Sequence, residues 1–320
     1  MRKTLKLILI TLFFGISLNG YSQTKDEAGK AYNQGIEYVK SDEPEKAIAS
    51  LENAIDICNK VGFEADDLKA MAEQQLPAQY YKSATALYKA KKIDEAISRY
   101  EKTVDVAKKY NDADIEKKSN KMIPQLYNLK GTSYYKKKDY ENALKYFDIS
   151  TQKDSDFAKG YYSKGLTYNK LKDAVKMKES FDLAILKAEA KGSTKTVAKS
   201  KKAAKKYLVN FAVKSIQNEK ITDALMYLDQ AGEYGEGDAN TYYYYAIAYN
   251  KKSKWDDAII AANKGLELEK DAKAKIYFEL GTALHGKGDN AAACNAYKEA
   301  AYGEHIAQAN YQIKEVLKCQ

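Results

Sequence analysis

Tyrosine and lysine recur together along this sequence, and their pairing is its clearest chemical pattern. A lysine follows eight residues after each of four tyrosines, in the pairs Tyr32 and Lys40, Tyr81 and Lys89, Tyr162 and Lys170, and Tyr243 and Lys251. Phe278 extends the aromatic series, Lys136 extends the lysine series, and Asn169 and Asn250 each precede one of the lysines. Tyrosine supplies contact area with a hydrogen-bonding tip, and lysine attracts anionic groups. The combination is typical of a binding surface.

Residues that catalyse reactions or hold metal ions are scarce. The chain has two histidines, His285 and His305, which lie close together near its end. No glycine loop that could cradle a phosphate, no zinc-ligand spacing and no nucleophile motif occurs. We therefore expect a protein without enzyme activity, metal or cofactor.

A lysine segment forms a second basic feature. No acidic residue occurs between Glu189 and Glu219, while lysines are frequent, among them Lys195, Lys199, Lys202 and Lys206. One interpretation is an anionic-surface site that docks onto a membrane surface, an acidic glycan or an acidic protein. The other is a solvated, frayed extension, in which like charges one turn apart repel each other.

The chain has three cysteines, Cys58, Cys294 and Cys319. A turn near Gly303 to His305 would fold the segments that carry Cys294 and Cys319 against each other, so a disulfide between them is feasible in an oxidising compartment. Cys58 is then left without a partner and is expected to be a small buried residue.

An internal repeat determines how these residues are positioned. In "LKGTSYYKKKDYENALKYFDIS" the residues Gly131, Tyr134, Ala143 and Phe147 form a skeleton that recurs along the chain. This skeleton resembles the tetratricopeptide repeat (TPR) family, whose unit is a pair of helices. In that register, units start near Ala28, Pro77, Pro124, Ala158, Lys205, Ala239 and Ala274.

Three positions of the unit carry the resemblance. The eighth is small in every unit, as Gly35, Ala84, Gly131, Gly165, Ala212, Ala246 and Gly281. The twentieth is alanine except at Met177, and the twenty-fourth is large except at Ala262. A small residue at the eighth position lets two helices approach closely. The proline that the family carries near position 32 is absent and is replaced by residues such as Asn59, Ser155 and Glu189.

The resemblance implies an all-α, right-handed superhelical solenoid of about seven TPR helix hairpins over residues 23–307, with a C-terminal capping helix over 308–320. It also places the fifth residue of each unit, the row Tyr32, Tyr81, Tyr162, Tyr243 and Phe278, in a concave groove. Tyr242, Tyr245 and Tyr249 of "NTYYYYAIAYN" fall on the face that the resemblance turns toward the partner helix, so we expect them in the core.

Units that start at Pro77, Pro124 and Lys205 are preceded by 13 to 15 extra residues. The apolar stripe runs straight through both prolines, which predicts lengthened first helices that are kinked near the prolines, where a backbone hydrogen bond is lost. The alternative is a short extra helix that ends before each proline.

The first 22 residues form a separate segment. Arg2 and Lys3 precede an apolar run from Leu7 to Leu18, and small residues, Gly20 and Ser22, come before Gln23. This pattern predicts a signal peptide and export, most simply to the periplasm of a Gram-negative bacterium; an uncleaved anchor is the alternative. Its removal would lower the net charge from +9 to +6. Nucleic acid is therefore not an expected partner, and a membrane would be bound only at its surface.

These features lead to one principal hypothesis and two alternatives. The principal one is a protein-protein interaction scaffold of the cell envelope that holds a protein or peptide segment, with a preference for anionic groups, in the groove. The first alternative is binding of cell-wall glycans through the aromatic row, and the second is peripheral membrane association through the lysine segment.

Overall fold

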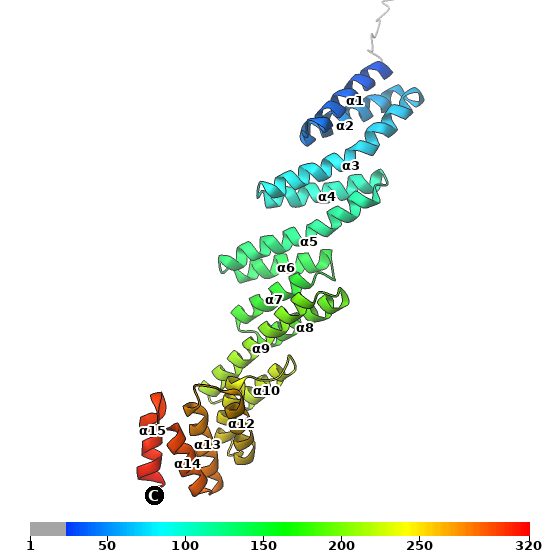
Figure 1. The fold of residues 1–320 in the computed structure, drawn as a ribbon. Coiled ribbons are helices and arrows are strands. Elements are labelled where there is room, and N and C mark those ends of the chain that lie inside the picture. Colours follow the sequence, from blue (N-terminus) through cyan, green and yellow to red (C-terminus); the bar gives the residue numbers. More distant parts are fainter. Residues whose placement is uncertain (1–23) are drawn as a thin grey trace, which may run out of the picture. The chain divides into compact units, whose positions relative to one another are not determined.

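The computed structural model describes residues 24–320, so the predicted signal peptide lies outside the described residues. Every regular element in this part of the chain is helical (Figure 1). The chain divides into two compact units, with the boundary between Asn120 and Lys121 inside helix α5. The first unit contains α1 (Lys25–Lys40), α2 (Pro44–Val61), a 3-10 turn (Phe63–Ala65), α3 (Asp66–Lys89), α4 (Ile93–Lys109) and the start of α5 (Ala113–Lys136).

The second unit contains the remaining helices. These are α6 (Tyr140–Lys153), α7 (Ala158–Leu171), α8 (Ala174–Ala190), α9 (Thr194–Gln217), α10 (Ile221–Gly232), α11 (Ala239–Lys251), α12 (Trp255–Leu268), α13 (Ala274–Lys287), α14 (Asn290–Ala300) and α15 (Ile306–Tyr311), which continues as a π-helical turn (Gln312–Val316). Over residues 24–320 the helices form seven antiparallel hairpins, α1/α2 to α13/α14, followed by a C-terminal helix. The predicted all-α class, built of TPR-like hairpins with a terminal helix, is confirmed.

A small-on-large contact holds together the hairpins that carry glycine at the eighth position. All seven small residues at the eighth position are buried, and the glycines among them lie directly against the large residue of the second helix. A Cβ atom added to Gly131 would come within 2.6 Å of the Phe147 ring, and one added to Gly35 within 3.0 Å of Leu51. The missing side chain is therefore what lets the two helices approach.

The turn inside each hairpin also repeats. One residue in each of the seven turns has a left-handed backbone, with φ from 54° to 91°, namely Asp42, Lys91, Lys138, Lys172, Glu219, Ser253 and Gly288. In several hairpins an aspartate then accepts a hydrogen bond from the first turn of the second helix, as Asp139 does from the Asn142 backbone N–H at 3.1 Å. Caps of this kind satisfy donors that the helix start leaves open.

The extra residues before Pro77 and Pro124 are helical. Helices α3 and α5 continue through both prolines, so the prediction of lengthened first helices is confirmed and the alternative of a short extra helix is wrong. Helix α9 has the same length as α3 and α5, 24 residues.

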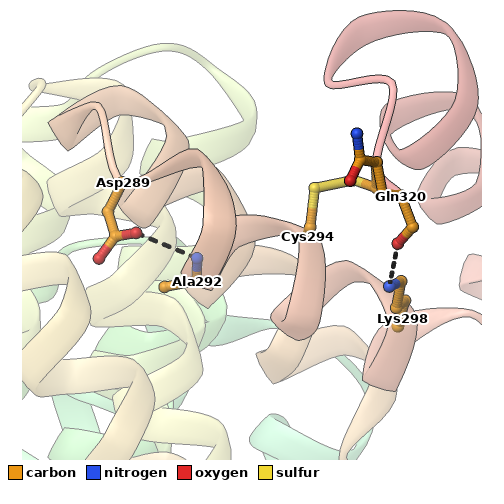
Figure 2. The surroundings of a disulfide bond; sticks show 6 residues. Asp289, Ala292, Cys294, Lys298 and Gln320 are labelled. Atoms are coloured by element: carbon orange, nitrogen blue, oxygen red, sulfur yellow. Dashed lines mark hydrogen bonds between the residues drawn. A yellow bond between two sulfur atoms is a disulfide. The ribbon is translucent and has the colours of Figure 1, made fainter.

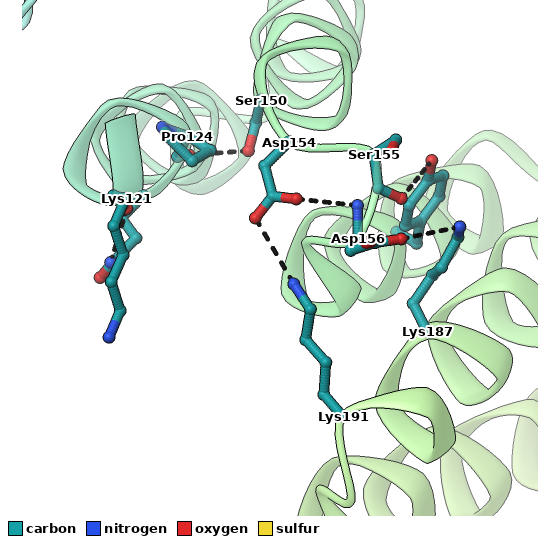
Figure 3. Close-up of polar contacts among 10 residues, drawn as sticks. Lys121, Pro124, Ser150, Asp154, Ser155, Asp156, Lys187 and Lys191 are labelled. Atoms are coloured by element: carbon teal, nitrogen blue, oxygen red, sulfur yellow. Dashed lines mark hydrogen bonds and ion pairs between the residues drawn. The ribbon is translucent and has the colours of Figure 1, made fainter. Parts of the chain in front are cut away.

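Polar contacts fix the turn between α6 and α7, where the family's proline is missing (Figure 3). The Asp156 backbone N–H donates to the Asp154 carboxylate at 2.9 Å, and the Asp156 carboxylate pairs with Lys187 of α8 at 2.9 Å. Lys191 lies 3.7 Å from Asp154, and the Ser150 hydroxyl donates to the Pro124 carbonyl at 2.7 Å. Side-chain contacts thus replace the conformational restriction that a proline would give.

The C-terminal helix is fastened to the last hairpin. Cys294 of α14 and Cys319 form a disulfide, with Cα atoms 5.8 Å apart (Figure 2). The terminal carbonyl of Gln320 accepts a hydrogen bond from Lys298 of α14 at 2.9 Å. Among the helices described, none combines the length and the apolar composition that a membrane crossing requires.

Candidate functional site

The aromatic row lies on the first helices of five hairpins, with Tyr32 and Tyr81 in the first unit and Tyr162, Tyr243 and Phe278 in the second. Three of its rings meet a ring of their own hairpin's second helix edge-on. The pairs are Tyr81 on Tyr100 (5.6 Å, 71°), Tyr162 on Phe181 (5.6 Å, 62°) and Phe278 on Tyr297 (5.4 Å, 61°). The supporting rings are fully buried and the row residues are half-buried. Each of these three rings is therefore held in place by a buried ring while part of its surface stays accessible.

The other two hairpins lack this supporting ring, because Leu51 and Ala262 occupy its position. Tyr32 packs against an aliphatic cluster that includes Leu51. Tyr243 contacts the Tyr244 ring at 5.2 Å, and the Lys275 ammonium group lies 5.1 Å from the Tyr243 ring centre. Burial, together with the nearby Glu279 carboxylate, raises the pKa of Tyr243 to about 12. Its hydroxyl is therefore a neutral hydrogen-bonding group at neutral pH.

The lysines of the series lie in the last turns of the first helices of five hairpins. Lys40, Lys89, Lys136 and Lys170 are exposed in the last turns of α1, α3, α5 and α7. Lys251, in the last turn of α11, is already paired with Glu219 at 2.9 Å. Exposed ammonium groups also interact favourably with helix carboxyl ends, so their position alone does not require a ligand.

The two asparagines differ from each other. Asn250 is buried, and its amide nitrogen donates to the Glu279 carboxylate at 2.8 Å and to the Glu279 backbone carbonyl at 2.9 Å. It therefore links α11 to α13, and the structure gives it this bridging role in place of the expected ligand contact. Asn169 is half-buried at the end of α7.

The lysine segment meets the aromatic row in the second unit. Helix α9 is continuous over Thr194–Gln217 and buries Ala204, Leu208 and Ala212, so the alternative of a frayed extension is wrong over these residues. The Lys199 ammonium group lies 4.5 Å from the centre of the Tyr162 ring, and Lys195, Lys202 and Lys206 are exposed. The sequence suggested two separate sites; the structure joins them at Tyr162 and Lys199.

Three tyrosines of α11 do not have the expected core position. Tyr242, Tyr245 and Tyr249 are half-buried and line a cavity of about 580 Å³ between α10 and α12. Helix α12 has the small residues Ala261 and Ala262 beside the rings, and α10 ends at Gly232, so the rings are only partly covered. Asp229, Asp257 and Lys264, which the sequence analysis did not identify, also line the cavity.

Metal-ligating residue types and the free cysteine have the following positions in the part of the chain that the structure describes. No group of three or more histidine, cysteine or acidic side chains there is placed to hold a metal ion. Cys58 is buried, as expected, and burial raises the pKa of its thiol, which disfavours the reactive thiolate.

Comparison with known proteins agrees with the repeat pattern. A family model for the tetratricopeptide repeat matches residues 124–148 and 274–302, which begin at two of the predicted unit starts. No curated protein matches this sequence.

Similar solved structures include YrrB, described as a TPR protein with an unusual peptide-binding site (17% identity, 60% of this chain and 91% of that one, TM-score 0.39). Others are a tetratricopeptide repeat protein from Parabacteroides merdae (14% identity, 88% and 96%, TM-score 0.28) and the TPR2AB domain of yeast Sti1 in complex with pHSP90 (16% identity, 92% and 98%, TM-score 0.33).

Proposed function

Because the chain is a tetratricopeptide repeat protein, we propose that it is a non-catalytic scaffold that binds a segment of a partner protein through the aromatic row. TPR proteins are in general protein-interaction scaffolds, and the regular edge-on support of Tyr81, Tyr162 and Phe278 is the observation that carries the proposal. Rings that are held in place before binding lose little conformational entropy when a partner covers them.

The charge near the row favours a partner segment with acidic groups. Lys199 lies against the Tyr162 ring, while Lys195, Lys202 and Lys206 are exposed on the same helix. A carboxylate placed beside Tyr162 would therefore meet positive potential as well as an aromatic surface.

We also propose that the protein is exported, to the periplasm in a Gram-negative bacterium. The basic and apolar start of the sequence and the Cys294–Cys319 disulfide support this location, since disulfides persist in oxidising compartments. Mass spectrometry of the protein from the envelope fraction should find a mature chain that begins near Gln23. An intact Met1 terminus in the cytosolic fraction would contradict export.

The binding proposal is tested by removing two row side chains. Tyr81→Ala with Tyr162→Ala should weaken capture of partner proteins from envelope extracts by about tenfold, because each ring is a central contact. The matched control is Tyr302→Ala with Tyr311→Ala, which removes two exposed tyrosines outside the repeat positions of the candidate site. The circular-dichroism melts show whether both double variants remain folded. Equal capture by the two double variants would contradict the proposal.

Titration with peptidoglycan fragments and sedimentation with anionic vesicles distinguish the alternatives. A saturable change in tyrosine fluorescence on adding glycan would favour the glycan interpretation. Salt-sensitive cosedimentation that depends on Lys195, Lys202 and Lys206 would favour surface binding to membranes.

A further inference from the structure

The cavity beside α11 has a composition that differs from the aromatic row. It lies between α10 and α12, and the rings of Tyr242, Tyr245 and Tyr249 form its wall. The Tyr245 and Tyr249 rings are stacked, 5.8 Å apart at 16°, and Tyr242 lies 6.3 Å from Tyr245. None of the aromatic-row residues lines this cavity.

The charge around the cavity is negative, although the whole chain is basic. Asp229 accepts a hydrogen bond from the Tyr245 hydroxyl at 2.8 Å. Because this hydroxyl is neutral, the hydrogen bond does not balance the negative charge of the carboxylate. Lys264 is the cation in the lining, and it lies 3.6 Å from Glu236 and 3.4 Å from Glu267. Glu236, which also lines the cavity, and Glu267 therefore balance Lys264. Asp257 pairs with Lys254 at 3.8 Å, so Asp229, whose printed partner is the neutral Tyr245 hydroxyl, gives the cavity its acidic character.

The first unit contains a cavity at the corresponding place in the repeat, of about 780 Å³, in which a cation of the chain already lies over a tyrosine ring. It is lined by Tyr80 of α3 and by Glu95, Arg99 and Lys102 of α4. The Tyr80 hydroxyl donates to Glu52 of α2 at 2.7 Å, as Tyr245 does to Asp229 of α10. The Arg99 guanidinium lies 5.5 Å from the centre of the Tyr80 ring and 3.1 Å from the Glu45 carboxylate.

Four lining positions of the two cavities correspond in the repeat, while Tyr245 and Tyr249 stand where the first unit has Ser83 and Leu87. Counted from Pro77 and from Ala239, Tyr80 corresponds to Tyr242, Glu95 to Asp257, Arg99 to Ala261 and Lys102 to Lys264. Glu52 and Asp229 hold one position in the preceding repeats, counted from Ala28 and from Lys205. Ala261 replaces the arginine in the second cavity, and Thr222 stands where the first unit has Glu45. The second cavity has a lysine nearby instead, since Lys254 lies 5.9 Å from the centre of the Tyr249 ring and 3.8 Å from Asp257.

We propose that the cavity between α10, α11 and α12 binds the guanidinium group of an arginine from a partner protein. The group would lie over the Tyr242 and Tyr245 rings and face Asp229, in the way that Arg99 lies over Tyr80 and faces Glu45. Arginine suits this site because its planar, weakly hydrated cation stacks on aromatic rings and donates to carboxylates at the same time. The site is separate from the aromatic row. The row would favour acidic groups of a partner, whereas the cavity would bind a cationic group.

The test follows the Ile260 methyl group by NMR during titration. Ile260 lines the cavity and is 68% exposed, so a bound side chain would change its environment. The probe is the peptide acetyl-Gly-Arg-Gly-amide, and the control probe carries citrulline, which has the shape of arginine without its charge. At constant ionic strength we expect a saturable shift with arginine only, with millimolar affinity.

Two variants locate the contact. Asp229→Asn keeps an acceptor for the Tyr245 hydroxyl but removes the charge, and should weaken binding about tenfold. Asp223→Asn makes the same change on α10 outside the cavity lining and should have no effect. Ala261→Arg should abolish binding, because the chain's own guanidinium would then occupy the cavity.

Each contrary outcome overturns the proposal. Equal shifts with arginine and citrulline would exclude charge recognition, and no saturable shift would exclude the site. If Asp229→Asn and Asp223→Asn weakened binding equally, the arginine peptide would be attracted to the negative charge of α10 in general and not to the cavity. Because the assay uses neither an envelope extract nor the aromatic row, its failure would leave the proposed scaffold function untouched.

Discussion

Gly281 of α13 lies directly against the ring of Tyr297 of α14, so close that a Cβ atom on the glycine would come within 2.8 Å of two ring carbons. Tyr297 is almost fully buried and its hydroxyl contacts that of Thr282 at 3.2 Å, so the ring has little freedom to move away. The two helices are therefore packed more closely than a Cβ atom at position 281 would allow.

Gly281→Ala should destabilise the protein despite the higher helix propensity of alanine. The propensity gain is at most about 1 kcal/mol, whereas overpacking a rigid core contact costs about 1–3 kcal/mol. A lower midpoint in the circular-dichroism melt is the expected result.

Gly29→Ala in α1 is the matched control, because no atom lies within 4 Å of the added Cβ. It should leave stability unchanged or raise it by about 0.5–1 kcal/mol. If both variants raise the melting midpoint, the close contact with Tyr297 does not disfavour a larger side chain at position 281.

The repeat could be predicted from sequence because it depends on side-chain size at fixed intervals. Small residues such as Gly131 and large ones such as Phe147 determine the hairpin by themselves, and the structure pairs them as expected. The cavity at Tyr245 could not be predicted in the same way. Its formation depends on the early end of α10 at Gly232 and on Ala261 of a different helix, and thus on contacts between neighbouring repeats.

The candidate site was likewise predictable in part. The aromatic row follows from the register, but the contact between Lys199 and Tyr162 joins helices α9 and α7, whose spacing the unit pattern does not specify because of the extra residues before Lys205. Asn250 shows the same limit, since its partner Glu279 belongs to the next hairpin.

The edge-on support of the row predicts an indirect effect on binding. Phe181→Leu should weaken partner capture about threefold, because Tyr162 would lose the ring that holds it. Phe147→Leu makes the same core change in a hairpin whose row position is Asn128. Capture by this control should stay at the wild-type level once both variants are compared at equal folded fraction. An equal loss of partner capture in both variants would indicate that lower stability, and not the loss of the ring beside Tyr162, weakens binding.

The disulfide should stabilise the C-terminal helix in particular. Cys294→Ala with Cys319→Ala should lower the local stability of α15 by about 3 kcal/mol, since the bond closes a segment with a sequence separation of 25. Faster amide exchange confined to residues 303–320 is the expected observation, and treatment of the wild type with reductant should reproduce it. Unchanged exchange in α15 would mean that packing on α14 alone holds the helix.

Glu279 should make stability depend on pH in an unusual direction. Burial against α11 raises the pKa of its carboxyl group above the reference value of 4.5, and the hydrogen bond from Asn250 and the charge of Lys251 offset this only in part. The folded state therefore holds a proton that the unfolded state has already released at the same pH. Stability from this group is present below about pH 4.5 and is lost as the pH rises through the folded-state pKa.

Glu279→Gln removes this ionisation and keeps an acceptor for the Asn250 amide. The variant should be more stable than the wild type at pH 8 by on the order of 1 kcal/mol, and the difference should vanish near pH 4. Paired thermal melts at both pH values measure it, with Glu299→Gln on α14 as an exposed control that should show no such trend. A Glu279→Gln variant that is less stable at pH 8 would mean that the ionised carboxylate, through Asn250 and Lys251, stabilises the contact between α11 and α13.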